Sequence, residues 1–202
     1  QYHDDFRAWW QYESTNFVTY WYGKARNVAI PTILTAEMDH SQIQHALEHR
    51  INDKIEIIVY LDISDLKQSN IGTEETFVGN TGETKIVGNK MFVYFDGNHL
   101  NLRKKIREGI ATVYFNNMLF GSNIREIIQN ALLLNLPEWY KLGIVAYAAS
   151  NWDADAEETL RDLWYQYPDK NKFESLAADY PKITGQAFWF FIEQQYGKAT
   201  IT

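Results

Sequence analysis

The chain has 202 residues, of which 46% are hydrophobic and 15% aromatic, so it can bury a sizeable core and is not a disordered protein. Its net charge of −7 argues against wholesale binding to nucleic acid or an anionic membrane, because neutralising phosphates requires clustered lysine and arginine. The absence of cysteine rules out a disulfide framework, a thiolate nucleophile and Cys-ligated zinc, and no apolar run is long enough to span a membrane.

The first half of the chain contains strand patterns and one long helix. Residues 16–22 are rich in aromatic and β-branched side chains and end at Gly23, which predicts a strand. Residues 27–50 predict a helix, with Pro31 near its start or at a kink. The near-continuous apolar run over 54–61 predicts a buried strand.

A short helix over 62–68 is expected next, with Asp62 or Ser64 as its cap. The following segment, 69–90, is rich in glycine, threonine and asparagine. Within and after it, the pattern predicts strands over 84–87 and 91–95, the second ending at a turn that begins at Asp96.

From His99 onward the pattern is helical, with glycine, serine, asparagine and proline separating the segments. The predicted helices span 99–120, 123–134, 138–150, 155–166 and 182–196. Because strands come early and helices late, the predicted fold class is α+β: a small N-terminal mixed sheet with a long helix, followed by a helical C-terminal half. We predict one domain over 1–202, sheet-rich over about 1–98 and helical over about 99–202.

Three sequence stretches carry a resemblance to a known family. The early strand ends in Trp21-Tyr22-Gly23, one late helix opens with Leu136-Pro137-Glu138-Trp139-Tyr140, and the last helix pattern runs from Thr184 to Gly197. Together with the order of the predicted elements, they resemble the gluzincins, the peptidase MA-like class of zinc metallopeptidases. The resemblance implies a zincin-like fold over most of the chain.

The family holds its zinc with two histidines at i and i+4 of one helix, a glutamate beside the first as general base, and a third ligand from a later helix. Where the family has His-Glu-x-x-His, this sequence reads Glu108-Gly109-Ile110-Ala111-Thr112. The resemblance therefore places Glu108 at the first ligand position, Gly109 at the general-base position and Thr112 at the second ligand position.

The family's later Trp-Phe-x-Glu-Gly-x-Ala-Glu-Tyr corresponds to residues 139–147. The third ligand position then falls on Leu142 and the second acidic position on Ala146. The residues that would support the cleft, Trp139, Gly143 and Tyr147, match the family. The chain thus keeps the supporting residues of the motif and lacks its metal ligands.

One carboxylate cannot hold a catalytic zinc, which takes three protein ligands. Losing the base would also remove proton transfer, which contributes about a hundred- to ten-thousand-fold in rate. The sequence therefore predicts a degenerate metallopeptidase site with no catalytic residue, no metal and no cofactor. A helical core with a chance likeness to the family is the alternative.

A second candidate motif, His45-Ala46-Leu47-Glu48-His49, matches the inverted zinc motif His-x-x-Glu-His. On a helical wheel the apolar residues Ile43, Leu47 and Ile51 fall on one side, and both histidines fall on the other. The prediction is two solvent-facing histidines rather than a metal site.

The resemblance implies a function as well as a fold. Similar domains precede a Tol-type β-propeller in bacterial envelope proteins, so we expect a non-catalytic binding or scaffolding module in the periplasm or cell envelope. Its partner would be a peptide or protein, held along the edge strand by strand addition. The chain begins at Gln1, which fits either removal of a signal segment or a domain taken from a longer protein that carries a C-terminal propeller.

Two further functions stay open from the sequence. The chain could be an active hydrolase with a relocated site that uses Glu108, Glu126 or Glu138 together with His99. It could also be a structural spacer without a defined cleft. The first requires those side chains to converge on one cleft.

Overall fold

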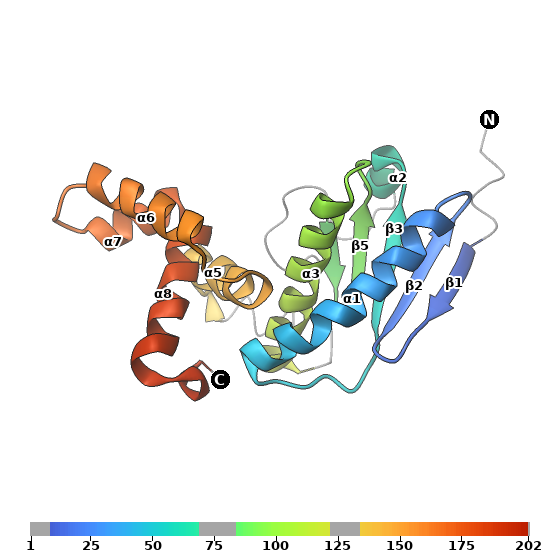
Figure 1. The fold of residues 1–202 in the computed structure, drawn as a ribbon, viewed down its shortest axis with the longest axis horizontal. Helices are drawn as coiled ribbons and strands as arrows, with labels where there is room; N and C mark the ends of the chain where they lie inside the picture. Colours follow the sequence, from blue (N-terminus) through green and yellow to red (C-terminus); the bar gives the residue numbers. More distant parts are fainter. Residues whose placement is uncertain (1–8, 69–83, 122–133, 202) are drawn as a thin grey trace.

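The computed structural model describes residues 9–68, 84–121 and 134–201 and shows an α+β fold: a five-strand mixed sheet with a long helix, then a mostly helical C-terminal half (Figure 1). The strands are β1 (Trp9–Glu13), β2 (Phe17–Tyr22), β3 (Ile55–Tyr60), β4 (Thr84–Val87) and β5 (Lys90–Tyr94). The helices are α1 (Arg26–Leu47), α2 (Ile63–Gln68), α3 (His99–Phe120), α5 (Glu138–Ala149), α6 (Ala154–Gln166), α7 (Lys172–Asp179), α8 (Pro181–Tyr196) and the 3₁₀ helix η2 (Lys198–Thr200).

The sheet has the strand order β1-β2-β3-β5-β4. Its three central strands are parallel, and both edge strands pair antiparallel with their neighbours. Phe17 lies opposite Ile55, and Ile57 lies opposite Met91. Since side chains alternate between the two faces of a strand, this register gathers these apolar residues on one face.

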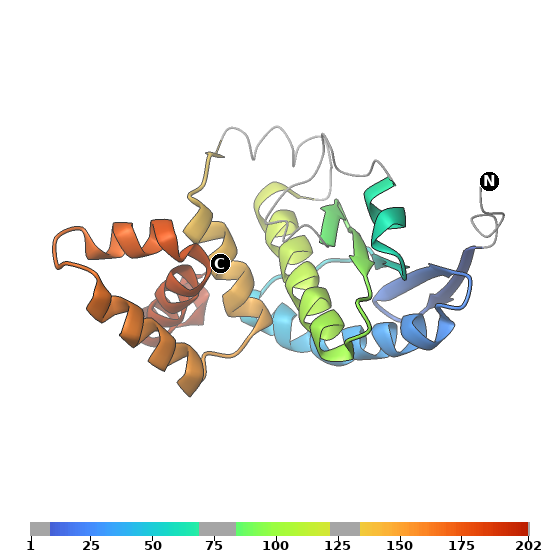
Figure 2. The same ribbon diagram turned by 90° about the horizontal axis from the view of Figure 1, so that it is seen from above.

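Helices α1 and α3 cover that face, and the short α2 lies on the other (Figure 2). The core between the sheet and the two long helices includes Ile43, Ile57, Met91, Ile110 and Tyr114, all completely buried. Helix α3 begins at His99 because the side chain of the preceding Asn98 accepts hydrogen bonds from two free N–H groups of the first turn, those of Leu100 and Asn101.

The C-terminal helices lie at one end of the sheet layer, with α5 packed between α3 and α8 (Figure 2). Helices α5 and α8 approach so closely that a Cβ added at Gly185 would lie 1.9 Å from the Trp139 carbonyl oxygen and 2.7 Å from Gly143 Cα. Only glycine permits this backbone contact.

The structure confirms most of the predicted elements and corrects some. The strands predicted over 16–22, 54–61, 84–87 and 91–95 are β2, β3, β4 and β5, and the helix predicted over 99–120 is α3. Asp62 caps α2 by accepting a 2.8 Å hydrogen bond from the N–H of Ser64. Pro31 lies inside α1, five residues after its first residue. The sequence reading missed β1 and α7, and the helix predicted over 123–134 lies outside the described residues.

A buried carboxylate joins α1 to α3. Asp39 has a side chain only 5% exposed, and it pairs with the guanidinium groups of Arg103 and Arg107, each at 2.7 Å. Burial alone would raise the pKa of Asp39, but the hydrogen bonds and charges of the two arginines outweigh it and hold the pKa below its ordinary value.

We expect Asp39→Ala to lower the free energy of unfolding by about 3 kcal/mol at neutral pH, since it leaves the largely covered Arg107, 15% exposed, without its carboxylate. The pKa of Asp39 is lower in the folded protein than in the unfolded one. Its contribution to stability is therefore complete above the unfolded pKa of about 3.9 and is lost as the pH falls through the folded pKa. The difference between the two proteins in urea unfolding should therefore shrink below about pH 4. Asp162→Ala, at an exposed position on α6, is the matched control and should change little. An equal effect of both substitutions would contradict the role given to Asp39.

Candidate functional site

Helices α3 and α5, which carry the two halves of the motif, pack directly against each other. The Phe115 and Tyr140 rings lie 6.5 Å apart, and the Arg107 guanidinium donates a 2.6 Å hydrogen bond to the Ala149 carbonyl at the end of α5. The N-terminal half of α3 thus lies near the C-terminal end of α5. The structure brings together the two helices that the resemblance requires to be neighbours.

Glu108, at the first ligand position, is bound by a lysine. Its carboxylate forms an ion pair with the ammonium of Lys182, in the first turn of α8. Lys182 lies one helical turn before Gly185, and Gly185 touches Gly143, the neighbour of Leu142. Through Lys182, Glu108 is thus joined to α8, the helix that packs on α5 at Gly143.

The next two motif positions face the protein interior. A Cβ at Gly109 would lie 2.5 Å from both Sδ and Cε of Met91 in β5, so the general-base position is turned toward the sheet. Thr112 is 5% exposed, and its hydroxyl donates a 2.7 Å hydrogen bond to the Glu108 carbonyl one turn earlier. Neither position carries a histidine, cysteine or carboxylate, the side chains that bind zinc.

The positions on α5 are apolar. Leu142 is half-buried, and Ala146 is buried with its carbonyl accepting a 3.4 Å hydrogen bond from the side chain of Gln186. These two residues cannot supply the third ligand or the second acidic group that the resemblance assigns to their positions.

The supporting residues of the motif all contact α8. Trp139 packs edge-on against Phe188, and Gly143 meets Gly185. The Tyr147 hydroxyl donates a 2.8 Å hydrogen bond to Glu193, and burial together with that carboxylate raises the Tyr147 pKa well above its ordinary value. The scaffold residues therefore serve the packing of α5 on α8.

The residues present at the motif positions do not fit a catalytic zinc. Within the described ranges, no group of three or more histidine, cysteine, aspartate and glutamate side chains is placed to hold a metal ion. At the motif itself, only Glu108 among the ligand positions carries a metal-binding side chain, and an ammonium group already contacts it.

The structure does not bring His99 and Glu108 together. They are nine residues apart on α3, which is about 13 Å at 1.5 Å per residue. The His99 ring packs instead against Phe95, with centroids 4.8 Å apart. Glu138 lies exposed in the first turn of α5, and Glu126 is outside the described residues.

The inverted motif is split by a helix end. Helix α1 ends at Leu47, and Glu48 adopts a left-handed conformation with φ of 45°. His45 is exposed, as expected. His49 is not: it is half-buried, with Nε2 2.7 Å from Asn117 Oδ1 of α3. The prediction for His49 was wrong because the helical wheel does not apply beyond Leu47.

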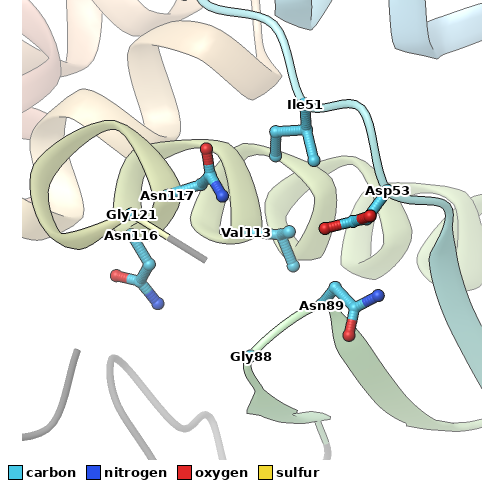
Figure 3. A pocket seen from close by; sticks show the side chains of 8 residues that line it. All are labelled: Ile51, Asp53, Gly88, Asn89, Val113, Asn116, Asn117 and Gly121. Atoms are coloured by element: carbon cyan, nitrogen blue, oxygen red, sulfur yellow. The ribbon is translucent and has the colours of Figure 1, made fainter. Parts of the chain in front are cut away.

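A small cavity of about 80 Å³ lies near the C-terminal end of α3 (Figure 3). It is lined by Ile51, Asp53, Gly88, Asn89, Val113, Asn116, Asn117 and Gly121. Asn116 is 3% exposed, and its side-chain oxygen has no hydrogen-bond partner among the residues that the structure describes. The volume suits a few water molecules, which would satisfy this oxygen. We assign no ligand to this cavity.

No model of a known protein family matches the chain, and no curated protein or solved structure shows detectable similarity to it. The gluzincin resemblance stays a prediction from the residues. Within the described part of the chain, no helix has the length and apolar character needed to cross a membrane.

Proposed function

We propose that this chain is a gluzincin-like domain without peptidase chemistry, which binds an extended peptide or protein segment along the edge strand β4. The observation that carries the first half of the proposal is the ion pair between Glu108 of α3 and Lys182 of α8. It places a lysine ammonium against the one carboxylate at the ligand positions. The positive partner that a metal would give to this carboxylate is thus supplied by the chain itself.

The second and third ligand positions, Thr112 and Leu142, also support a domain without a metal site. A zinc ion at this place would need two more ligands, and the chain offers a buried threonine and a leucine there. The Thr112 hydroxyl is already engaged with a backbone carbonyl. Zinc-dependent, chelator-sensitive cleavage of peptides by the isolated protein would contradict this part of the proposal.

The binding half of the proposal rests on the sheet topology. β4 is the last strand in the order, antiparallel to β5, and it lies beside α3. An extended peptide can add to such an edge, because the strand directs alternate backbone groups away from its neighbour. Each added backbone hydrogen bond contributes about 0.5–1.5 kcal/mol.

Proline substitutions along β4 test the binding edge. Successive N–H groups of a strand point to opposite edges, so of Thr84 and Lys85 one points its N–H toward β5 and the other away. Proline at the outward position should preserve the fold and weaken binding of peptides selected from a random library by up to about tenfold. Fluorescence anisotropy of labelled peptides measures the change.

The inward position is the control for this test, because proline there should disturb the pairing of β4 with β5 and lower the stability of the sheet. Alanine at the outward position should bind like the unaltered chain, since its backbone N–H remains. If proline at neither position changed peptide affinity while the protein stayed folded, binding by strand addition at β4 would be refuted.

We also propose a location in the periplasm or cell envelope, within a longer protein that carries a propeller after this domain. Only the resemblance supports this part. Fractionation of cells that produce the parent protein would test it, and recovery in the cytoplasm would contradict it.

A further inference from the structure

A second, larger cavity of about 350 Å³ lies where the C-terminal ends of α1 and α5 meet α8. Its volume is within the range of small-molecule sites. It includes none of the ligand or base positions of the motif. Its lining includes the His45 imidazole and, in addition, three amides, two stacked aromatic rings and one carboxylate: Gln42, Asn151, Gln186, Trp152, Phe190 and Glu193.

The two aromatic rings form one wall. Trp152 and Phe190 are stacked, with centroids 5.7 Å apart and planes 20° from parallel, and both are half-buried. The face of an aromatic ring carries partial negative charge, so it attracts the weakly positive hydrogens of C–H groups. The inner faces of the two rings contact each other, so a ligand meets an outer face of the pair, and a flat, C–H-rich ligand face suits it.

The amides are held in fixed orientations by their partners. Gln42 donates a 2.9 Å hydrogen bond to Asn151 Oδ1 and accepts one of 3.1 Å from Arg107. Asn151 accepts this bond through its oxygen, and none of the hydrogen bonds among the described residues involves its NH₂ group, which is therefore a remaining donor. Gln186 donates at 3.4 Å to the carbonyls of Ala146 and Ser150, so its Oε1 is a remaining acceptor.

The charges of the cavity compensate each other. Glu193 accepts the hydrogen bond of Tyr147 at 2.8 Å, and the Lys198 ammonium lies 3.7 Å from its other oxygen. A carboxylate has about four acceptor sites, so Glu193 can still accept from a ligand. The carboxylate and the ammonium that line the cavity are thus paired with each other, which favours a ligand without net charge.

We propose that this cavity binds a neutral, polyhydroxylated ring of the hexopyranose class. Each hydroxyl both donates and accepts, and so matches a wall that offers an amide donor at Asn151 and acceptors at Gln186 and Glu193. The C–H face of the sugar lies against an outer face of the stacked pair Trp152 and Phe190. An apolar ligand would leave the fixed amides unpaired, which costs free energy. The inference does not depend on peptide binding at β4.

Titration of the whole chain with neutral hexoses, N-acetylhexosamines and their disaccharides tests the proposal. In ¹H–¹⁵N spectra we expect saturable shifts of the side-chain amide signals of Gln42, Asn151 and Gln186 and of the Trp152 indole N–H for at least one of these sugars. Trp152→Ala should weaken that binding about tenfold.

Two further variants keep the test independent of folding. Asn151 is exposed, so Asn151→Ala should leave the fold intact and weaken binding about fivefold through loss of the amide donor. Trp164→Ala is the matched control: Trp164 lies on α6 with the Lys172 ammonium 5.0 Å from its ring, and it does not line the cavity. Sugar affinity of this variant should be unchanged.

The proposal would be overturned if no sugar of the panel shifted the cavity signals, or if Trp152→Ala and Asn151→Ala bound as tightly as the unaltered chain. Shifts of the same signals by charged peptides alone would also overturn it, since the site would then recognise a different chemistry.

Discussion

Zinc binding is expected to appear when the three ligands of a gluzincin site are introduced on α3 and α5. The variant combines Glu108→His and Thr112→His with Leu142→Glu, and adds Lys182→Ala to remove the competing ammonium. Two histidines at i and i+4 with a carboxylate from the second helix complete the three-ligand set of a catalytic zinc site. We expect a dissociation constant of about 1 μM or tighter by isothermal titration calorimetry, against no binding by the unaltered chain in that range.

The matched control places the glutamate one residue earlier, with Lys141→Glu in place of Leu142→Glu. One residue turns a side chain by about 100° around the helix, so this carboxylate should miss the site and the affinity should fall by at least about tenfold. Circular dichroism establishes that both variants are folded. A folded variant that binds zinc no better than its control would show that α3 and α5 do not meet as they do in a gluzincin.

Gly185→Ala is expected to lower the free energy of unfolding by about 3 kcal/mol. The added Cβ would lie 1.9 Å from the Trp139 carbonyl oxygen and 2.7 Å from Gly143 Cα, and both belong to the backbone of α5. Backbone cannot turn aside as a side chain can, so α8 must move away from α5. The loss should exceed the gain of about 1 kcal/mol that alanine offers over glycine inside a helix.

Gly109→Ala is the comparison that isolates this effect. Its Cβ would also make close contacts, at 2.5 Å, but with the Sδ and Cε atoms at the end of the flexible Met91 side chain. We expect a loss below about 1 kcal/mol, because Met91 can change rotamer and alanine favours the helix. Urea unfolding of both variants gives the difference. Equal stabilities would contradict the close approach of α5 and α8.

The elements that the sequence predicted well have strong local patterns. β3 is a run of apolar residues that is buried on both faces, and α3 follows an asparagine that caps its first turn. β1 has no such pattern, because all five of its residues are exposed and it exists through pairing with β2. α7 is an eight-residue helix whose buried residues are only Leu176 and Ala177, so its periodicity is too short to recognise.

For the candidate site, the sequence predicted which residues stand at the motif positions, but it did not predict which residues they contact in the fold. The motif pointed to Glu108, but the ion pair of Glu108 with Lys182 joins residues that are 74 positions apart in the sequence. No local sequence pattern predicts such a contact. The Gly143–Gly185 contact carried a usable signal, since a glycine inside a helix pattern often marks a close approach of two backbones. The cavity between α1, α5 and α8 depends on the packing of three helices and could not be read from any one of them.

The most direct test of the central claim is anomalous scattering from crystals of the unaltered chain soaked in zinc. We predict electron density for Lys182 Nζ in contact with the Glu108 carboxylate, and no anomalous peak between Glu108, Thr112 and Leu142. A zinc peak at that position, with Glu108 as a ligand and Lys182 displaced, would contradict the claim that the ion pair of Glu108 and Lys182 occupies this position in place of a metal ion.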